Sequence, residues 1–231
     1  MEIPVFLAFT AAELSSRPLG AHCGYLGCRF SASGLGLGTI PRRLPEGGML
    51  IVTDSTDAAD HDPALVTGTL LALTETFRCE SVLLDFQKPG NPEALSIAKA
   101  VVAGLSCPVG VSEHYAETLP CPVLVSPIPP DILPQEHLQP WSGREIWLEL
   151  SREGRQIHVD GKGSRYSPLP HHTPTETALY DGELCCHYEI RLREDSICFS
   201  LGRTYEDLTA LLEKAKHHGV TRGVGLWQEL G

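Results

Sequence analysis

The 231-residue sequence has few basic residues: 18 lysines and arginines stand against 29 aspartates and glutamates, giving a formal charge of −11. Nucleic acids and anionic membranes need a basic surface to bind, so this balance argues against both as partners. No apolar run reaches the roughly 20 residues of a membrane span. The opening stretch MEIPVFLAFTAAEL carries neither the basic segment nor the small-residue cleavage site of a secretory signal. We therefore expect a cytoplasmic protein.

Motifs for metals and nucleotides are also lacking. None of the eight cysteines has the paired spacing of a zinc site, and several lie beside apolar runs, where a free thiol packs as a small hydrophobe. The only glycine cluster, GLGLG at 34–38, leads into Thr39-Ile40-Pro41 rather than into a helix, so it fits neither a dinucleotide fingerprint nor a phosphate loop. We expect a flexible loop there and predict no cofactor.

What the sequence does contain is an alternation of short apolar runs and helical segments. Strands are predicted at 5–9, 49–54, 81–86, 108–112, 122–126, 145–150 and 223–227. Helical periodicity predicts helices over 63–77, 92–105 and 205–218, with Asp62, Asn91 and Thr204 as their N-caps. Apolar strands separated by helices indicate parallel β/α units, and continuous apolar runs indicate a sheet buried on both faces.

A closed barrel and an open doubly wound sheet both fit this alternation. The open nucleotide-binding sheet needs a glycine-rich turn into a helix, which the sequence does not have. We predict a single-domain (β/α)8 barrel over 1–231, with strand 223–227 closing against 4–9. Residues 151–200 break the alternation and are rich in turn formers. We interpret them as a polar insertion before the last strand, with a β-hairpin turning near 193–195.

Part of the chain resembles a known family. The stretch FRCESVLLDFQKPGNPE at 77–93 resembles the fourth barrel strand of the family 18 glycoside hydrolases, the chitinase-like and spore-germination-type barrels. That strand carries a DGxDxDxE signature in the family. The C-terminal stretch 188–230, with its hairpin, helix and GVGLW strand, resembles the end of the same barrels. The resemblance implies a (β/α)8 fold, a site at the carboxyl ends of the strands, and a carbohydrate ligand.

The signature is matched only in part. Asp85 stands where the family has its third aspartate, and Gln87 stands where it has the catalytic glutamate. Glu80, Ser81 and Leu83 replace the earlier signature positions. Outside the signature, the resemblance places the sugar-stacking tryptophan at Trp227, and Ser126 lies where the family's sixth-strand tyrosine is expected.

These departures bear on the reaction. In the family the glutamate protonates the glycosidic oxygen, while the aspartate two residues earlier holds the acetamido group of the substrate. An amide cannot act as an acid near neutral pH, so position 87 cannot supply general-acid catalysis. It can still hydrogen-bond a sugar. We therefore predict a degenerate catalytic pair, Asp85 and Gln87, in a barrel that still binds a glycan or a related small ligand.

Other candidates follow predicted strands. Those for substrate binding are Trp227, Glu113, His114, Ser126, Glu149 and Glu229. After strand 49–54, Asp54 and Asp57 in TDSTDAADHDP are weak candidates for a hard divalent cation, though solvated loop charges are the simpler interpretation. Two alternatives stay open: an active glycosidase using another carboxylate, such as Glu113, Glu149 or Glu229, and a non-catalytic structural or protein-interaction barrel. The oligomeric state does not follow from the sequence.

Overall fold

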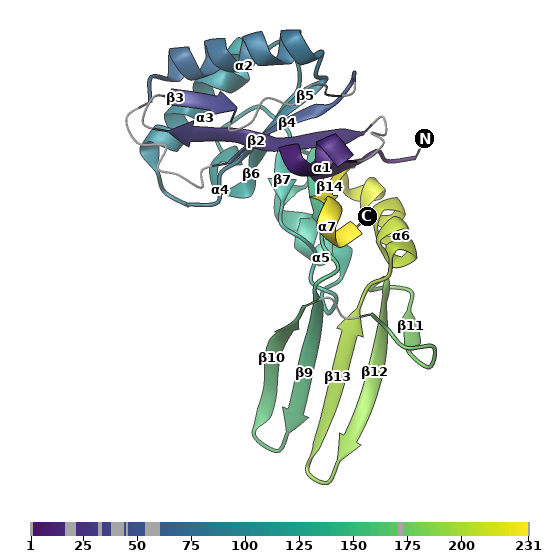
Figure 1. Cartoon of the computed structure of the whole chain (residues 1–231). Helices are drawn as coiled ribbons and strands as arrows, with labels where there is room; N and C mark the ends of the chain where they lie inside the picture. Colours follow the sequence, from purple (N-terminus) through teal and green to yellow (C-terminus); the bar gives the residue numbers. More distant parts are fainter. Residues whose placement is uncertain are drawn as a thin grey trace.

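The computed structural model describes residues 2–16, 22–31, 34–37, 44, 46–53, 61–170 and 173–230. Eight parallel strands form a closed barrel (Figure 1). They are β1 (Val5–Phe9), β2 (Cys23–Ser31), β4 (Met49–Thr53), β5 (Ser81–Asp85), β6 (Val109–Ser112), β7 (Val123–Val125), β8 (Ile146–Leu150) and β14 (Val220–Leu226). β1 pairs with β14 on one side and with β2 on the other, which closes the ring. The predicted (β/α)8 barrel and its closure by 223–227 are confirmed.

The glycine cluster is not a loop where the structure describes it. Gly34–Leu37 forms β3, which pairs antiparallel with Cys28–Ser31 of β2. β1 covers β2 only over Cys23–Tyr25, so the backbone groups farther along β2 need another partner, and β3 supplies it. The prediction of a flexible loop at 34–37 is wrong, because glycine backbone groups form a ladder as well as any others.

The three long helices begin where the sequence predicts. They are α2 (Pro63–Phe77), α3 (Pro92–Gly104) and α6 (Tyr205–Ala215). Asp62 and Asn91 accept first-turn amides, and Thr204 forms a reciprocal capping box with Asp207. The short helices are α1 (Ala11–Ser16), α4 (Glu113–Ala116), α5 (Pro134–Leu138) and α7 (Trp227–Leu230), with 3-10 turns η1 (Gln139–Trp141) and η2 (Lys216–His218). None of the described helices is both long and apolar enough to cross a membrane.

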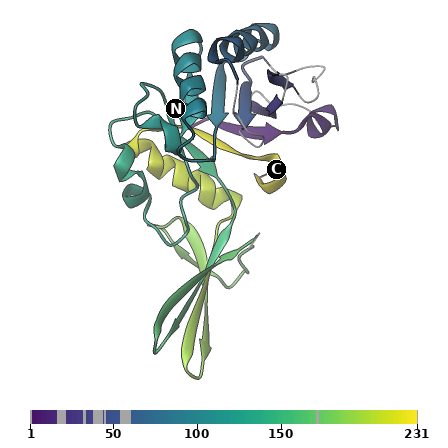
Figure 2. The ribbon, with the colours of Figure 1, turned by 90° about the vertical axis from the view of Figure 1, so that its left-hand side faces the viewer.

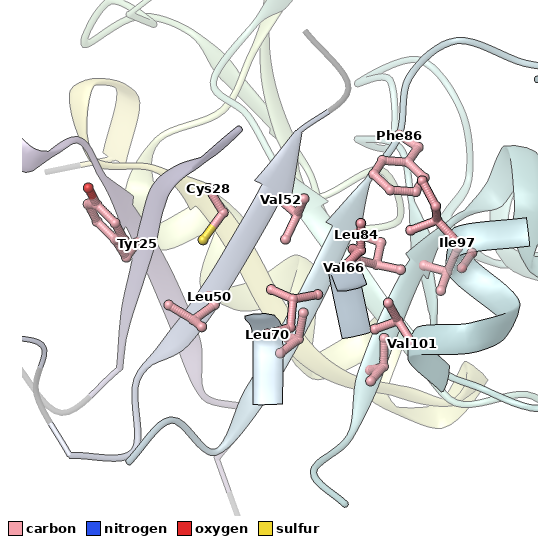
Figure 3. Packing of buried hydrophobic residues seen from close by; sticks show 14 of the residues in the cluster. Tyr25, Cys28, Leu50, Val52, Val66, Leu70, Leu84, Phe86, Ile97 and Val101 are labelled. Carbon is pink, nitrogen blue, oxygen red and sulfur yellow. The ribbon is translucent and has the colours of Figure 1, made fainter. Parts of the chain in front are cut away.

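The core has an outer and an inner layer. Figure 3 shows the outer layer, where Leu50 and Leu84 on the strands face Leu70 of α2 and Ile97 of α3. The inner layer fills the barrel with Phe6, Ala8, Met49, Ile51, Leu83, Leu124, Trp147 and Val224. Residues of both layers alternate along each strand, which explains the continuous apolar runs of the sequence.

A cation closes the amino-terminal end of the barrel. The Arg222 guanidinium lies 4.8 Å from the Trp147 ring centre and 5.2 Å from that of Phe6. It donates to Glu80 Oε1 at 2.8 Å and to Ser81 Oγ at 3.0 Å. These contacts plug that end of the barrel with a paired cation stacked on aromatic faces. A ligand site inside the barrel therefore has access from the opposite, carboxyl-terminal end.

Residues between β8 and α6 form a second sheet, the arm. Its strands are β9 (Gly154–Asp160), β10 (Gly163–Leu169), β11 (Leu179–Asp181), β12 (Cys186–Arg193) and β13 (Ser196–Gly202), all antiparallel in the order β10-β9-β13-β12-β11. The arm projects away from the barrel in both views (Figures 1 and 2). The predicted hairpin is β12–β13, and a second hairpin, β9–β10, lies beside it.

Buried polar contacts hold the arm to the barrel. Arg203, only 3% exposed, donates to the backbone carbonyls of Ile128 and Cys185, the latter at 3.1 Å. Arg155 of β9 donates to both carboxylate oxygens of Asp131, at 2.7 and 3.0 Å. Such charge-assisted, two-point contacts fix direction as well as position. The base of the arm is thereby tied to the loop that follows β7.

Candidate functional site at the barrel mouth

Strand alternation decides which side chains face the carboxyl-terminal opening, here called the barrel mouth. Leu83, Leu124 and Trp147 belong to the inner layer. Residues two positions later lie on the same side of a strand, so Asp85, Ser126 and Glu149 face the mouth. Asp85 pairs in register with Thr53 of β4, and Glu149 with Val224 of β14. The mouth is therefore a polar layer above an apolar barrel interior.

The predicted catalytic pair is in contact. The side-chain amide of Gln87 donates a hydrogen bond to the Asp85 carboxylate. Asp85 is partly buried, whereas Gln87 is exposed just beyond the end of β5. The pair keeps one carboxyl group and one neutral amide side by side, and the amide of Gln87 is not a proton donor of suitable acidity at neutral pH.

The loop after Gln87 is fixed by Tyr115, which follows the candidates Glu113 and His114 in α4. Its hydroxyl donates to the Lys88 carbonyl and accepts from the Asn91 amide at 3.2 Å. The Tyr115 side chain is buried and meets Phe86 edge-on, with ring centres 6.1 Å apart. Because Asn91 also caps α3, this hydroxyl links the mouth loop to the start of the helix.

Glu149 has the most unusual environment at the mouth. Burial, the largest cause, raises the pKa of its carboxyl from 4.5 to about 7, with further contributions from the negative charges of Asp85, Glu229 and Glu113. Three carboxylates that the sequence placed at separate strand ends, Asp85, Glu113 and Glu229, therefore act on Glu149 at the mouth. At neutral pH a large fraction of Glu149 holds its proton and can donate a hydrogen bond or a proton.

Glu229 belongs to the wall of the mouth through Ser151. The Ser151 hydroxyl donates to Glu229 Oε2 at 2.8 Å, and Ser151 Oγ accepts from the Glu153 amide at 3.0 Å. Ser151 also borders a pocket of about 260 Å³ between the loop after β7 and the base of the arm. Its other walls include Pro127, Pro130, Arg155, Tyr166 and Pro168. The mouth thus has a neighbouring concave surface of mixed polarity.

The remaining candidates are less deeply placed. Glu113 opens α4 and is partly buried, whereas His114 beside it is exposed. Ser126 is partly buried, and its carbonyl contacts His137 Nε2 at 3.1 Å. These three residues follow β6 and β7, so they lie on one arc of the rim next to Asp85.

Trp227 packs on the outer side of the barrel wall. Its ring stacks on Phe9, with centres 5.0 Å apart and planes 20° apart, and it joins the outer layer of the core. The preceding residue, Leu226, lies two positions after the inner-layer residue Val224 and so faces the same side of β14; it is 40% exposed at the rim. A sugar that stacks on Trp227 would have to use the ring face opposite Phe9.

A second polar group that the sequence did not reveal lies after β1. Thr10 donates both its amide and its hydroxyl to Glu13 Oε2, at 2.8 and 2.9 Å. Gln228 of α7 donates to Glu13 Oε1 at 3.0 Å. Phe6 and Ala8 face the barrel interior, so Thr10, two residues later, is expected on the same side of the strand. This alternation is the only feature of the sequence that indicates the group.

The weak metal candidates Asp54 and Asp57 lie outside the described residues. Among the residues that are described, no group of three or more histidine, cysteine or acidic side chains is arranged to hold a metal ion. All eight cysteines are described and are free thiols.

No family model and no curated protein matches the sequence. Solved structures do match. A family 18 N-acetylglucosaminidase from Paenibacillus barengoltzii is 9% identical with a TM-score of 0.63, covering 98% of this chain and 95% of that one. The C-terminal domain of a chitinase-type protein from Desulfitobacterium hafniense is 13% identical with a TM-score of 0.60, covering 98% and 94%. A chitinase-like agglutinin from Robinia pseudoacacia is 10% identical with a TM-score of 0.59, covering 96% and 94%.

These matches extend over nearly the whole length of each partner, arm included. At 9–13% identity, these matches show the fold and not the chemistry of the site. The chain has the (β/α)8 barrel fold of the family 18 glycoside hydrolases.

Proposed function

We propose that the protein binds a glycan containing N-acetylglucosamine at the barrel mouth and does not hydrolyse it. The observation that carries the proposal is the contact between Gln87 and Asp85, which keeps the geometry of a carboxylate pair with an amide in place of the acid. Without a proton on the leaving oxygen, a factor of typically 10²–10⁴ in rate is lost. Binding needs only donors, acceptors and a concave surface.

The groups at the mouth suit a sugar. Asp85 accepts hydrogen bonds, Gln87 both donates and accepts, and protonated Glu149 donates. The pocket beside Ser151 extends the surface along which a short oligosaccharide can lie. Among the structures of the same fold, one is named as an N-acetylglucosaminidase and one as a chitinase-like agglutinin, so the fold occurs both in an enzyme and in a protein named for binding.

The test is calorimetric titration with N-acetylglucosamine oligomers. We expect the wild type to bind, and Asp85→Ala to weaken binding by at least about tenfold through loss of one charged acceptor. Glu75→Ala serves as the matched control, because Glu75 is an exposed carboxylate on α2. No binding by the wild type, or equal loss in both variants, would reject the proposal.

Hydrolysis by a different acid is the second candidate function. It is favoured by Glu149, whose raised pKa of about 7 keeps a proton available at the mouth beside Asp85. Such an enzyme would release fluorophore from fluorogenic N-acetylglucosamine oligomers, would lose activity as the pH rises through about 7, and would be inactive as Glu149→Gln. An inactive wild type together with measurable binding decides for the first function.

A further inference from the structure

The two faces of the arm differ in chemistry. Alternation and cross-strand register place six apolar side chains on one face, here called the apolar face of the arm: Ile157, Val159, Ile190, Leu192, Ile197 and Phe199. The register aligns them in rows, with Val159, Ile197 and Leu192 nearest the tip. The opposite face carries polar and charged side chains, among them His158, Arg165 and Arg191. An antiparallel sheet of this kind normally buries its apolar face.

Within the described chain, half of this face stays exposed, whereas Ile157, Val159 and Phe199 are partly buried. Leu192 is 75% exposed, Ile190 48% and Ile197 38%, and Tyr166 of the neighbouring β10 is 61% exposed on the same face. No helix lies against the outer part of the arm in either view (Figures 1 and 2). Together with Leu179, these side chains expose on the order of 500 Å² of apolar surface, at the upper end of what a monomer normally shows.

We propose that the apolar face of the arm binds the same face of a second copy of this chain, so that two arms form a two-layer β-sandwich around a twofold axis. Such a contact is self-complementary, because each copy offers the same apolar rows to the other. Strands of seven residues are about 24 Å long, and two such sheets pack face to face at about 10 Å. The two copies together bury about 1,000 Å² or more, which reaches the lower range of specific interfaces.

The charges favour a second copy as the occupant. The chain carries a formal charge of −11, but among the described strand residues only Arg155 and Asp181 place a charged side chain on this face. Both lie at its barrel end, and Arg155 is paired with Asp131 at 2.7 Å. Two acidic chains can therefore meet here without opposing like charges. The arm projects from the barrel (Figure 1), so the charges of the barrel lie outside the contact, where salt screens them. The turns at the tip carry both signs, with Lys162, Glu194 and Asp195, which does not suit an anionic membrane.

Sedimentation velocity and light scattering on the full chain, with no sugar present, test this inference. It does not rest on the proposed glycan binding, although Arg155 and Tyr166 border both the pocket beside Ser151 and the apolar face of the arm. Between about 1 and 100 μM, the wild type should show twice the 25.1 kDa mass of one chain. Leu192→Lys should weaken dimerisation by at least about a hundredfold, because each dimer loses two buried leucines. Arg191→Ala, one residue away on the opposite face, should leave the dimer unchanged.

Folding is controlled by circular dichroism. Leu192 is exposed in the single chain, so Leu192→Lys should unfold at the temperature of an unmodified monomer. Ile190→Lys provides a second, independent change of the same face and should behave alike. A wild type that stays monomeric over the whole concentration range would overturn the inference. A dimer that persists in Leu192→Lys and Ile190→Lys, or one that Arg191→Ala abolishes instead, would overturn it as well.

Discussion

The carboxyl of Glu149 should make the stability of the protein depend on pH in a defined window. Its pKa in the folded protein is about 7, raised from 4.5 mainly by burial. Between these values the folded chain keeps a proton that the unfolded chain has lost, so the free energy of unfolding falls as the pH rises. The whole shift corresponds to about 3 kcal/mol. The stability that the retained proton contributes is fully present below pH 4.5 and is lost above pH 7.

Glu149→Gln removes this loss of stability at high pH, because glutamine resembles the protonated acid and does not ionise. Its stability relative to the wild type should be near zero at about pH 4 and should rise to about 3 kcal/mol at about pH 8. Above neutral pH the unfolding midpoint should increase by roughly 6–12 °C. Urea denaturation at a series of pH values measures the difference, with Glu75→Gln on the surface of α2 as control. A difference that does not change between pH 4.5 and 7 would show that Glu149 ionises normally and would contradict this prediction.

Two further predictions concern the barrel interior and the acid position. At Gly110 an added Cβ would lie 2.3 Å from Trp147 Cε3, so Gly110→Ala should lower the free energy of unfolding by about 1–3 kcal/mol. Gly68 lies in open space on α2, so Gly68→Ala should raise the free energy of unfolding by about 0.5–1 kcal/mol. Thermal unfolding measures both changes. Gln87→Glu returns the family's acid beside Asp85, but Leu83 still replaces a signature aspartate, so we expect little or no release from fluorogenic N-acetylglucosamine oligomers, and robust turnover would contradict this.

The barrel could be predicted from the sequence because its strands are apolar on both faces. Runs such as MLIVT and SVLLD have no polar phase, since one side packs in the barrel and the other under the helices. The hairpin of β9 and β10 escaped prediction for the opposite reason. GRQIHVD and GSRYSPL alternate weakly, and their apolar side is not covered within the described chain, so no continuous run marks them.

The candidate site was predictable as a set of strand ends, but not in its details. Asp85 and Glu149 follow apolar runs, so their convergence at one rim follows from the fold alone. Either Leu226 or Trp227 can face the mouth, depending on which alternate residues of β14 face the barrel interior. Both sets of alternate residues in GVGLW are apolar, so the sequence does not reveal which of the two it is. The raised pKa of Glu149 depends on burial and on carboxylates from three other segments, which only the folded arrangement brings near one another.

The most direct test of the proposed function follows one solution of wild-type protein and N-acetylglucosamine tetramer by NMR. Saturation transfer to the sugar reports binding, and reducing-end proton signals report every bond that is cleaved. We predict saturation transfer that Asp85→Ala removes, with no increase in reducing ends over a day of incubation. A growing reducing-end signal that disappears in Glu149→Gln would contradict this prediction and would make the protein an enzyme whose acid is Glu149.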